Sequence, residues 1–106
     1  MNVKENPVIM GAVNEVTELC DPYAVYLVSH KTGADGAVKA FKLCVVISDD
    51  RDPERTESEL LIKTDPPVPC DFIVYTLEEW DDCSQDDGSF AYRVENGGER
   101  LYVKEQ

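Results

Sequence analysis

The sequence is poor in cations and has no long apolar run. Its 106 residues carry 10 Lys and Arg against 22 Asp and Glu, a formal net charge of −12 at pH 7. Binding to nucleic-acid phosphates requires a cationic face, so we expect no nucleic-acid partner, and a basic protein fits this charge better. No apolar run approaches the roughly 20 residues of a transmembrane helix, and the first ten residues do not resemble a signal peptide. We therefore predict a cytoplasmic protein that makes no membrane contact.

The sequence also lacks the common signatures of metal and cofactor sites. Its four cysteines, Cys20, Cys44, Cys70 and Cys83, form no Cys-x-x-Cys pair, so their spacing gives no support to a zinc site. Cys44 and Cys70 lie in apolar segments, where a free thiol behaves as a small hydrophobe. No glycine-rich phosphate loop, Ser/His/Asp set or Cys/His pair is evident. We predict buried, reduced thiols, and neither a metal site nor a cofactor.

Hydrophobic residues make up 42% of the chain, which is enough for one modest core, and we predict a single domain over 1–106. Asn6 and Pro7 can begin a helix, and Thr76 with Glu79 forms a capping-box pattern before a helix that carries Trp80, a predicted core anchor. The patterns predict helices over 7–20, 53–62, 77–83 and 88–95, strands over 23–29, 39–47, 70–76 and 100–104, and a polar turn over 30–36. This order predicts an α/β (α+β) fold around a small sheet.

Two segments carry a succession of motifs. The segment 25–47 contains a serine and glycine turn before an apolar strand. The segment 70–105 contains Thr76-Leu77-Glu78-Glu79, Gly88-Ser89-Phe90, Gly97 or Gly98, and Leu101-Tyr102. In order and spacing these segments resemble the minimal nucleotidyltransferase domains of the DNA polymerase β superfamily. The resemblance implies a nucleotidyltransferase-like mixed sheet flanked by helices.

The same resemblance implies a degenerate active site. The family's turn reads Leu-Phe-Gly-Ser, a variable residue, Ala-Arg-Gly, and here Ser29 and Gly33 match, while Val28 replaces the first glycine and Thr32 replaces the arginine. The two Asp-x-Asp positions hold Ala40 and Lys42.

The family's third carboxylate corresponds to Asp71. Ala40 offers no ligand and Lys42 brings a positive charge, so the resemblance implies no catalytic residues and no metal ligands. It leaves Ser29, Thr32, Gly33, Lys42 and Asp71 as a candidate nucleotide-binding set, although ordinary turn chemistry is the simpler interpretation of Ser29 and Gly33.

Three interpretations stay open. The first is a domain that has lost catalysis and acts as a binding or regulatory module, with Lys42 paired to Asp71 where a metal would stand. The second is an active Mg²⁺-dependent nucleotidyltransferase that uses displaced carboxylates such as Asp35, Asp49 or Asp71. The third is an antitoxin-like partner of a basic, helical, toxin-like protein. A one-residue slip of the alignment would move other side chains into the ligand positions.

Overall fold

Four helices and four strands follow the predicted order in the computed structural model, which describes residues 6–86 and 88–104. They are α1 (Pro7–Cys20), β1 (Ala24–Thr32), β2 (Val38–Ile47), α2 (Pro53–Lys63), β3 (Cys70–Thr76), α3 (Leu77–Ser84), α4 (Phe90–Gly97) and β4 (Glu99–Val103). The ends of the predicted domain 1–106, and the first five residues of the segment expected not to be a signal peptide, lie outside the described residues. The predicted α+β class is confirmed.

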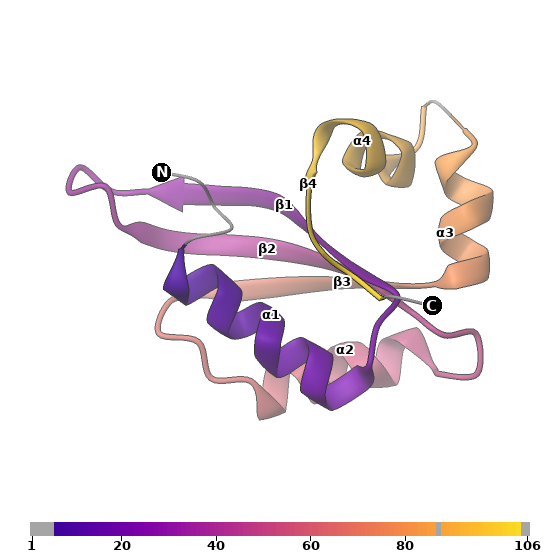
Figure 1. The fold of residues 1–106 in the computed structure, drawn as a ribbon, viewed down its shortest axis with the longest axis horizontal. Coiled ribbons are helices and arrows are strands. Elements are labelled where there is room, and N and C mark those ends of the chain that lie inside the picture. The colour runs from indigo at the N-terminus through magenta and orange to yellow at the C-terminus, as the bar shows by residue number, and fades with distance from the viewer. Residues whose placement is uncertain (1–5, 87, 105–106) are drawn as a thin grey trace.

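The strands form one mixed sheet in the order β3-β2-β1-β4. β1 runs antiparallel to both β2 and β4, whereas β2 and β3 are parallel. A parallel pair needs a crossover connection, and α2 supplies it. Figure 1 shows α1 and α2 on one side of the sheet and α3 and α4 on the other. The hairpin of β1 and β2 extends beyond α3 and α4, so its outer part lacks a helix on that face (Figure 1).

Each face of the sheet buries its own hydrophobic core. The core facing α1 and α2, here the first core, includes Ile9, Val13, Val16, Val25, Leu27, Phe41, Leu43, Val45, Ile47, Leu60 and Phe72. The core facing α3 and α4, the second core, consists of Ala24, Tyr26, Cys44, Val46, Trp80, Ala91 and Val94. A strand buried on both faces has a nearly continuous apolar sequence, which explains the run from Leu43 to Ile47.

Local sequence signals set the beginnings of two helices as predicted. The Asn6 side-chain oxygen accepts hydrogen bonds from the amides of Val8 and Ile9 at 3.0 and 3.2 Å, which begins α1. Thr76 Oγ1 accepts from the Glu79 amide at 3.2 Å, and Glu79 Oε1 accepts from the Thr76 amide at 3.0 Å, so the capping box is confirmed.

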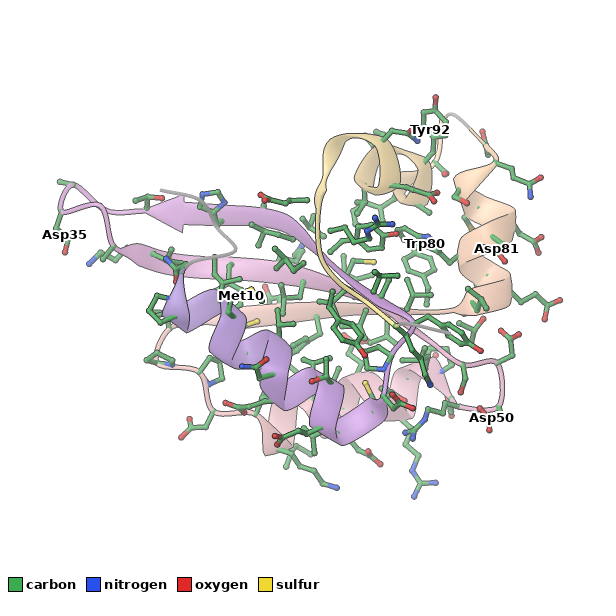
Figure 2. All side chains as sticks on the ribbon, viewed as in Figure 1. Met10, Asp35, Asp50, Trp80, Asp81 and Tyr92 are labelled. Atoms are coloured by element: carbon green, nitrogen blue, oxygen red, sulfur yellow. The ribbon has the colours of Figure 1, made fainter. Side chains whose placement is uncertain are left out.

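Trp80 is the aromatic anchor of the second core. Its side chain points from α3 toward the sheet (Figure 2), is 4% exposed, and stacks on Tyr26 with the ring centroids 5.1 Å apart. Tyr75 of β3 meets the same indole edge-on at 5.4 Å. The predicted role of Trp80 is confirmed, since three elements converge on this ring.

The predicted turn over 30–36 is wrong in its first half. β1 continues through Thr32, so His30 and Thr32 lie in a strand, and the Gly33 amide donates to the Ala37 carbonyl at 2.9 Å to close the turn. Cross-strand pairing with β2 outweighs the polar character of these residues, because strand preference depends on neighbours more than on composition. Gly36, at φ 82°, supplies the left-handed position of the turn.

The last predicted helix begins two residues late. Ser89 is its cap, accepting from the Tyr92 amide at 3.1 Å, so α4 starts at Phe90. Gly98 ends it, and a Cβ there would lie 2.6 Å from the Val94 carbonyl oxygen, so this position requires glycine.

The four cysteines are unpaired, as expected. Cys20 and Cys44 are buried, and burial raises the pKa of the Cys44 thiol to about 12 and that of Cys20 to about 11. Cys70, on the edge strand of the sheet, and Cys83, in α3, are only half-buried, so the predicted burial is wrong for these two thiols. None of the helices described is both long enough and apolar enough to span a membrane.

Candidate ligand-binding site

A hollow of about 390 Å³ lies on the part of the β1–β2 hairpin that extends beyond α3 and α4. Three strands contribute its lining: Ser29, His30 and Lys31 from β1, Ala40, Phe41 and Lys42 from β2, and Asp71 from β3. We call it the hairpin hollow. It contains Ala40, Lys42 and Asp71, the three positions that the resemblance assigns to the family's carboxylates.

The alternation of β2 places Lys42 in this hollow. Phe41 and Leu43 belong to the first core, and Cys44 belongs to the second. Successive side chains of a strand point to opposite faces, so Lys42 and Ala40 share the face of Cys44. The helices that cover Cys44 do not extend over Lys42, which is half-buried. Its ammonium therefore keeps contact with water, and the cost of burying a charge is avoided.

A β-bulge in β1 brings Ser29 to the same place. Leu27 pairs with Leu43 and Ser29 pairs with Lys42, so Val28 is an extra residue with no partner in β2. Without the bulge, Ser29 would share the face of Leu27 in the first core. With it, Ser29 stands opposite Lys42 and Val28 packs against the second core. Bulges commonly redirect a side chain in this way, and nothing in the sequence indicated this one.

Lys42 and Asp71 are register partners across the parallel pair of β2 and β3. The expectation that these two residues lie beside one another is thus confirmed. Among residues 6–86 and 88–104, however, ion pairs within 4.0 Å join only Lys39 to Asp35, Arg55 to Glu59 and Lys104 to Asp21. The expected direct pair between Lys42 and Asp71 is therefore not formed, because the strand register sets neighbouring positions but not the rotamers that would bring the two charged groups together.

Two members of the predicted nucleotide-binding set lie elsewhere. Thr32 pairs with Val38 near the tip of the hairpin, and Gly33 begins the turn. A Cβ at Gly33 would lie 2.4 Å from Lys39 Cε, so glycine leaves room for the Lys39 side chain, which reaches Asp35 at 3.4 Å. Gly33 thus serves the turn, and only Ser29, Lys42 and Asp71 of the predicted set meet.

The structure adds three residues to the hollow that the sequence did not single out for this site: His30, Lys31 and Phe41. His30 and Lys31 line it from β1, with Lys31 paired to Ala40 across the hairpin. Residues 29 to 32 are all polar and show no alternation of apolar and polar side chains, so the sequence contains no signal that the strand continues here. The segment 28–42 thereby holds three lysines and one aspartate, in a chain whose net charge is −12. The hairpin is locally cationic, and a local field of this sign favours an anionic ligand.

The displaced carboxylates of the second interpretation do not converge. Asp35 lies at the tip of the hairpin, where it also accepts from the Ala37 amide at 3.1 Å. Asp49 follows the opposite end of β2 and accepts from the Glu78 amide at 2.8 Å. Figure 2 shows Asp35 and Asp50, the neighbour of Asp49, at opposite ends of the molecule. Across the described part of the chain, no three His, Cys, Asp or Glu side chains are arranged to hold a metal ion.

Comparisons with family models, curated proteins and solved structures found no match to this chain.

Proposed function

We propose that this chain is a nucleotidyltransferase-like domain that has lost nucleotidyl transfer and serves as a binding or regulatory module for a phosphate-bearing ligand, a nucleotide above all. One observation carries the proposal. Lys42, Asp71 and Ser29 meet in one open hollow, and these residues occupy positions that the resemblance assigns to metal and phosphate contacts.

The chemistry of the hollow favours binding over transfer. Nucleotidyl transfer depends on divalent ions, held by clustered carboxylates, that neutralise phosphate charge and activate the attacking hydroxyl. Mg²⁺ prefers several oxygen ligands in octahedral geometry. Asp71 is the one carboxylate in the lining, Ala40 has no ligand atom, and Lys42 places a cation where the ion would stand. We infer that the Lys42 ammonium neutralises phosphate charge directly and cannot activate a hydroxyl as a metal ion does.

The lining offers further groups that recognise phosphate. Ser29 presents a hydroxyl donor opposite Lys42, and Lys31, exposed on the same strand as Ser29, adds a second cation. Hydrogen bonds from a charged donor to a phosphate oxygen are stronger than neutral ones. Because these groups are accessible to water, we expect weak, salt-sensitive binding.

The test is an NMR titration of the full chain with ATP, CTP, GTP and UTP, each with and without Mg²⁺. The proposal predicts shifts of the Ser29, Lys42 and Asp71 amides that do not need Mg²⁺ and weaken as salt is added. Lys42→Ala should weaken binding about tenfold, so that these shifts need correspondingly more nucleotide, whereas Lys63→Ala, a matched loss of an exposed lysine on α2, should preserve them.

Two results would overturn the proposal. Shifts that appear only with Mg²⁺ would mean that a metal site survives, and the interpretation as an active enzyme would return. An absence of shifts with every nucleotide would remove the nucleotide-binding function altogether.

A further inference from the structure

A second hollow, of about 360 Å³, lies at the outer edge of the sheet between α2 and β3. Its lining side chains are apolar except for that of Thr64, and they come from Leu61, Thr64, Pro66, Pro67, Val68, Pro69, Cys70 and Phe72. We call it the edge groove. It lies apart from the hairpin hollow, and the two share no lining residue.

One residue of the lining, Leu61, and its neighbour in the helix, Ile62, are exposed large hydrophobic side chains. Leu61 is 53% exposed and Ile62 is 80% exposed, at the last turn of α2. The helix needs neither for its packing, since Thr56 and Leu60 are the residues that it buries. An apolar hollow beside large exposed aliphatic side chains is typical of an interaction surface.

The strand beside the groove has an unpaired edge. β3 ends the sheet, with β2 as its one strand partner in the described chain. The Phe41 amide donates to the Pro69 carbonyl at 3.1 Å, and Cys70 is the register partner of Phe41. Backbone groups alternate along a strand, so Asp71 and Ile73 direct theirs to β2, while Cys70, Phe72 and Val74 direct theirs outward. An extended segment could therefore add to this edge and place alternate side chains in the groove.

The charges around the groove are mainly negative. Glu57 lies one helical turn before Leu61 on the same side of α2. Asp65 follows the helix, and its amide donates to Glu15 Oε2 at 3.2 Å, which brings the α1 carboxylate to this loop. Lys63 is the one cation between Glu57 and Cys70. A segment with Lys or Arg at its ends would complement this rim.

The same charges argue against a second copy of this chain as the occupant. Each copy would bring the same acidic rim and a net charge of −12, and like charges facing one another weaken association. We propose that the edge groove binds an extended, apolar segment of another protein that is flanked by basic residues, and that this segment pairs with the free edge of β3.

The proposal is tested by selecting binders to the full chain from a phage-displayed library of random linear peptides. We expect the enriched peptides to share alternating apolar residues between Lys or Arg. A synthesised member should slow amide exchange at Phe72 and Val74. The double change Leu61→Asp/Ile62→Asp should weaken its binding about tenfold or more. Both residues are exposed, so the variant should keep a dispersed, native-like NMR spectrum.

Val103→Asp is the matched control, because Val103 is 51% exposed on the opposite edge strand, β4. It adds a carboxylate to an exposed aliphatic position and should leave peptide binding unchanged. Any of four results would overturn the proposal: no enriched peptide, acidic or uncharged flanks in the consensus, equal binding to the Leu61→Asp/Ile62→Asp variant, or a dimer in sedimentation that this variant abolishes. The last would make the groove a contact between two copies. None of these readouts depends on nucleotide binding in the hairpin hollow.

Discussion

Asp71→Asn separates the proposed metal-independent site from a metal-dependent one, because the two mechanisms predict opposite effects. In a metal site the carboxylate holds the cation, so its loss weakens nucleotide binding. In the proposed site the cation is Lys42 itself, and the exposed carboxylate beside it would repel a phosphate bound there. Asparagine keeps the shape and removes the charge, so nucleotides should bind more tightly.

The size of the effect follows from the spacing of the strands. Adjacent strands lie about 4.8 Å apart, so a phosphate on Lys42 would lie on the order of 6 Å from the Asp71 carboxylate. Two unit charges at ~6 Å repel by about 0.7 kcal/mol in water. Asp71 is exposed, so the value for water applies rather than a larger one for a protein interior. Asp71→Asn should therefore tighten binding about threefold for each phosphate charge near the site.

The assay is calorimetric titration of ATP into the wild type and the variant, without Mg²⁺ and at low salt. Asp65→Asn is the control, since it removes an exposed carboxylate from the loop after α2, outside the hairpin hollow. It changes the net charge equally, so a tightening equal to that of Asp71→Asn would reduce the effect to long-range electrostatics. Weaker binding by Asp71→Asn would refute the assignment of Lys42 as the phosphate-binding cation.

Four further predictions concern the fold and the site. Lys42→Ala should change the free energy of unfolding by less than about 0.5 kcal/mol in urea titrations, since Lys42 forms no ion pair with another described residue, while weakening nucleotide binding about tenfold. Thr76→Ala removes one half of the capping box and should cost about 1 kcal/mol in the same assay, with Thr76→Ser restoring most of it. Trp80→Ala leaves a cavity in the second core and should lower the free energy of unfolding by about 3–5 kcal/mol. Burial raises the pKa of Cys44 from 9.0 to about 12, so the folded state retains a proton that the unfolded chain releases; stability should hold below pH 9 and fall as the pH rises toward 12, less steeply in Cys44→Ala.

The sequence predicted the elements and their order well where the signal is local. The capping box at Thr76 and the Asn6-Pro7 start of α1 depend on residues within one helical turn of each other. Each of these contacts joins residues that are close together in the sequence, and each formed as expected.

The site was predicted less well, because its geometry depends on pairing between strands. The bulge at Val28 decides that Ser29 faces Lys42, and it follows from packing on both faces of β1. No residue type marks it. The turn prediction failed for the same reason, since the polar residues His30 to Thr32 are held in a strand by their partners in β2. The expected ion pair of Lys42 and Asp71 depended on rotamers that register alone does not fix.

Apart from Phe41, the residues that line the hairpin hollow lie outside both cores, so their side chains can change while the fold persists. The second core reaches Cys44 along β2, and Ala40 and Lys42 lie beyond it on the same face. Exchanging an exposed or half-exposed side chain there alters no packed contact of that core, so the cost to folding is small. A change of side chain at position 40 or 42 therefore needs no compensating change in α3 or α4. Phe41, between these two positions, belongs to the first core and is 4% exposed, and Phe41→Ala should cost about 3–5 kcal/mol. We would measure the free energy of unfolding of Ala40→Ser, Phe41→Ala and Lys42→Ala. A large loss of stability in Phe41→Ala alone would show that positions 40 and 42 are independent of the core. Comparable losses in all three variants would show that they are not.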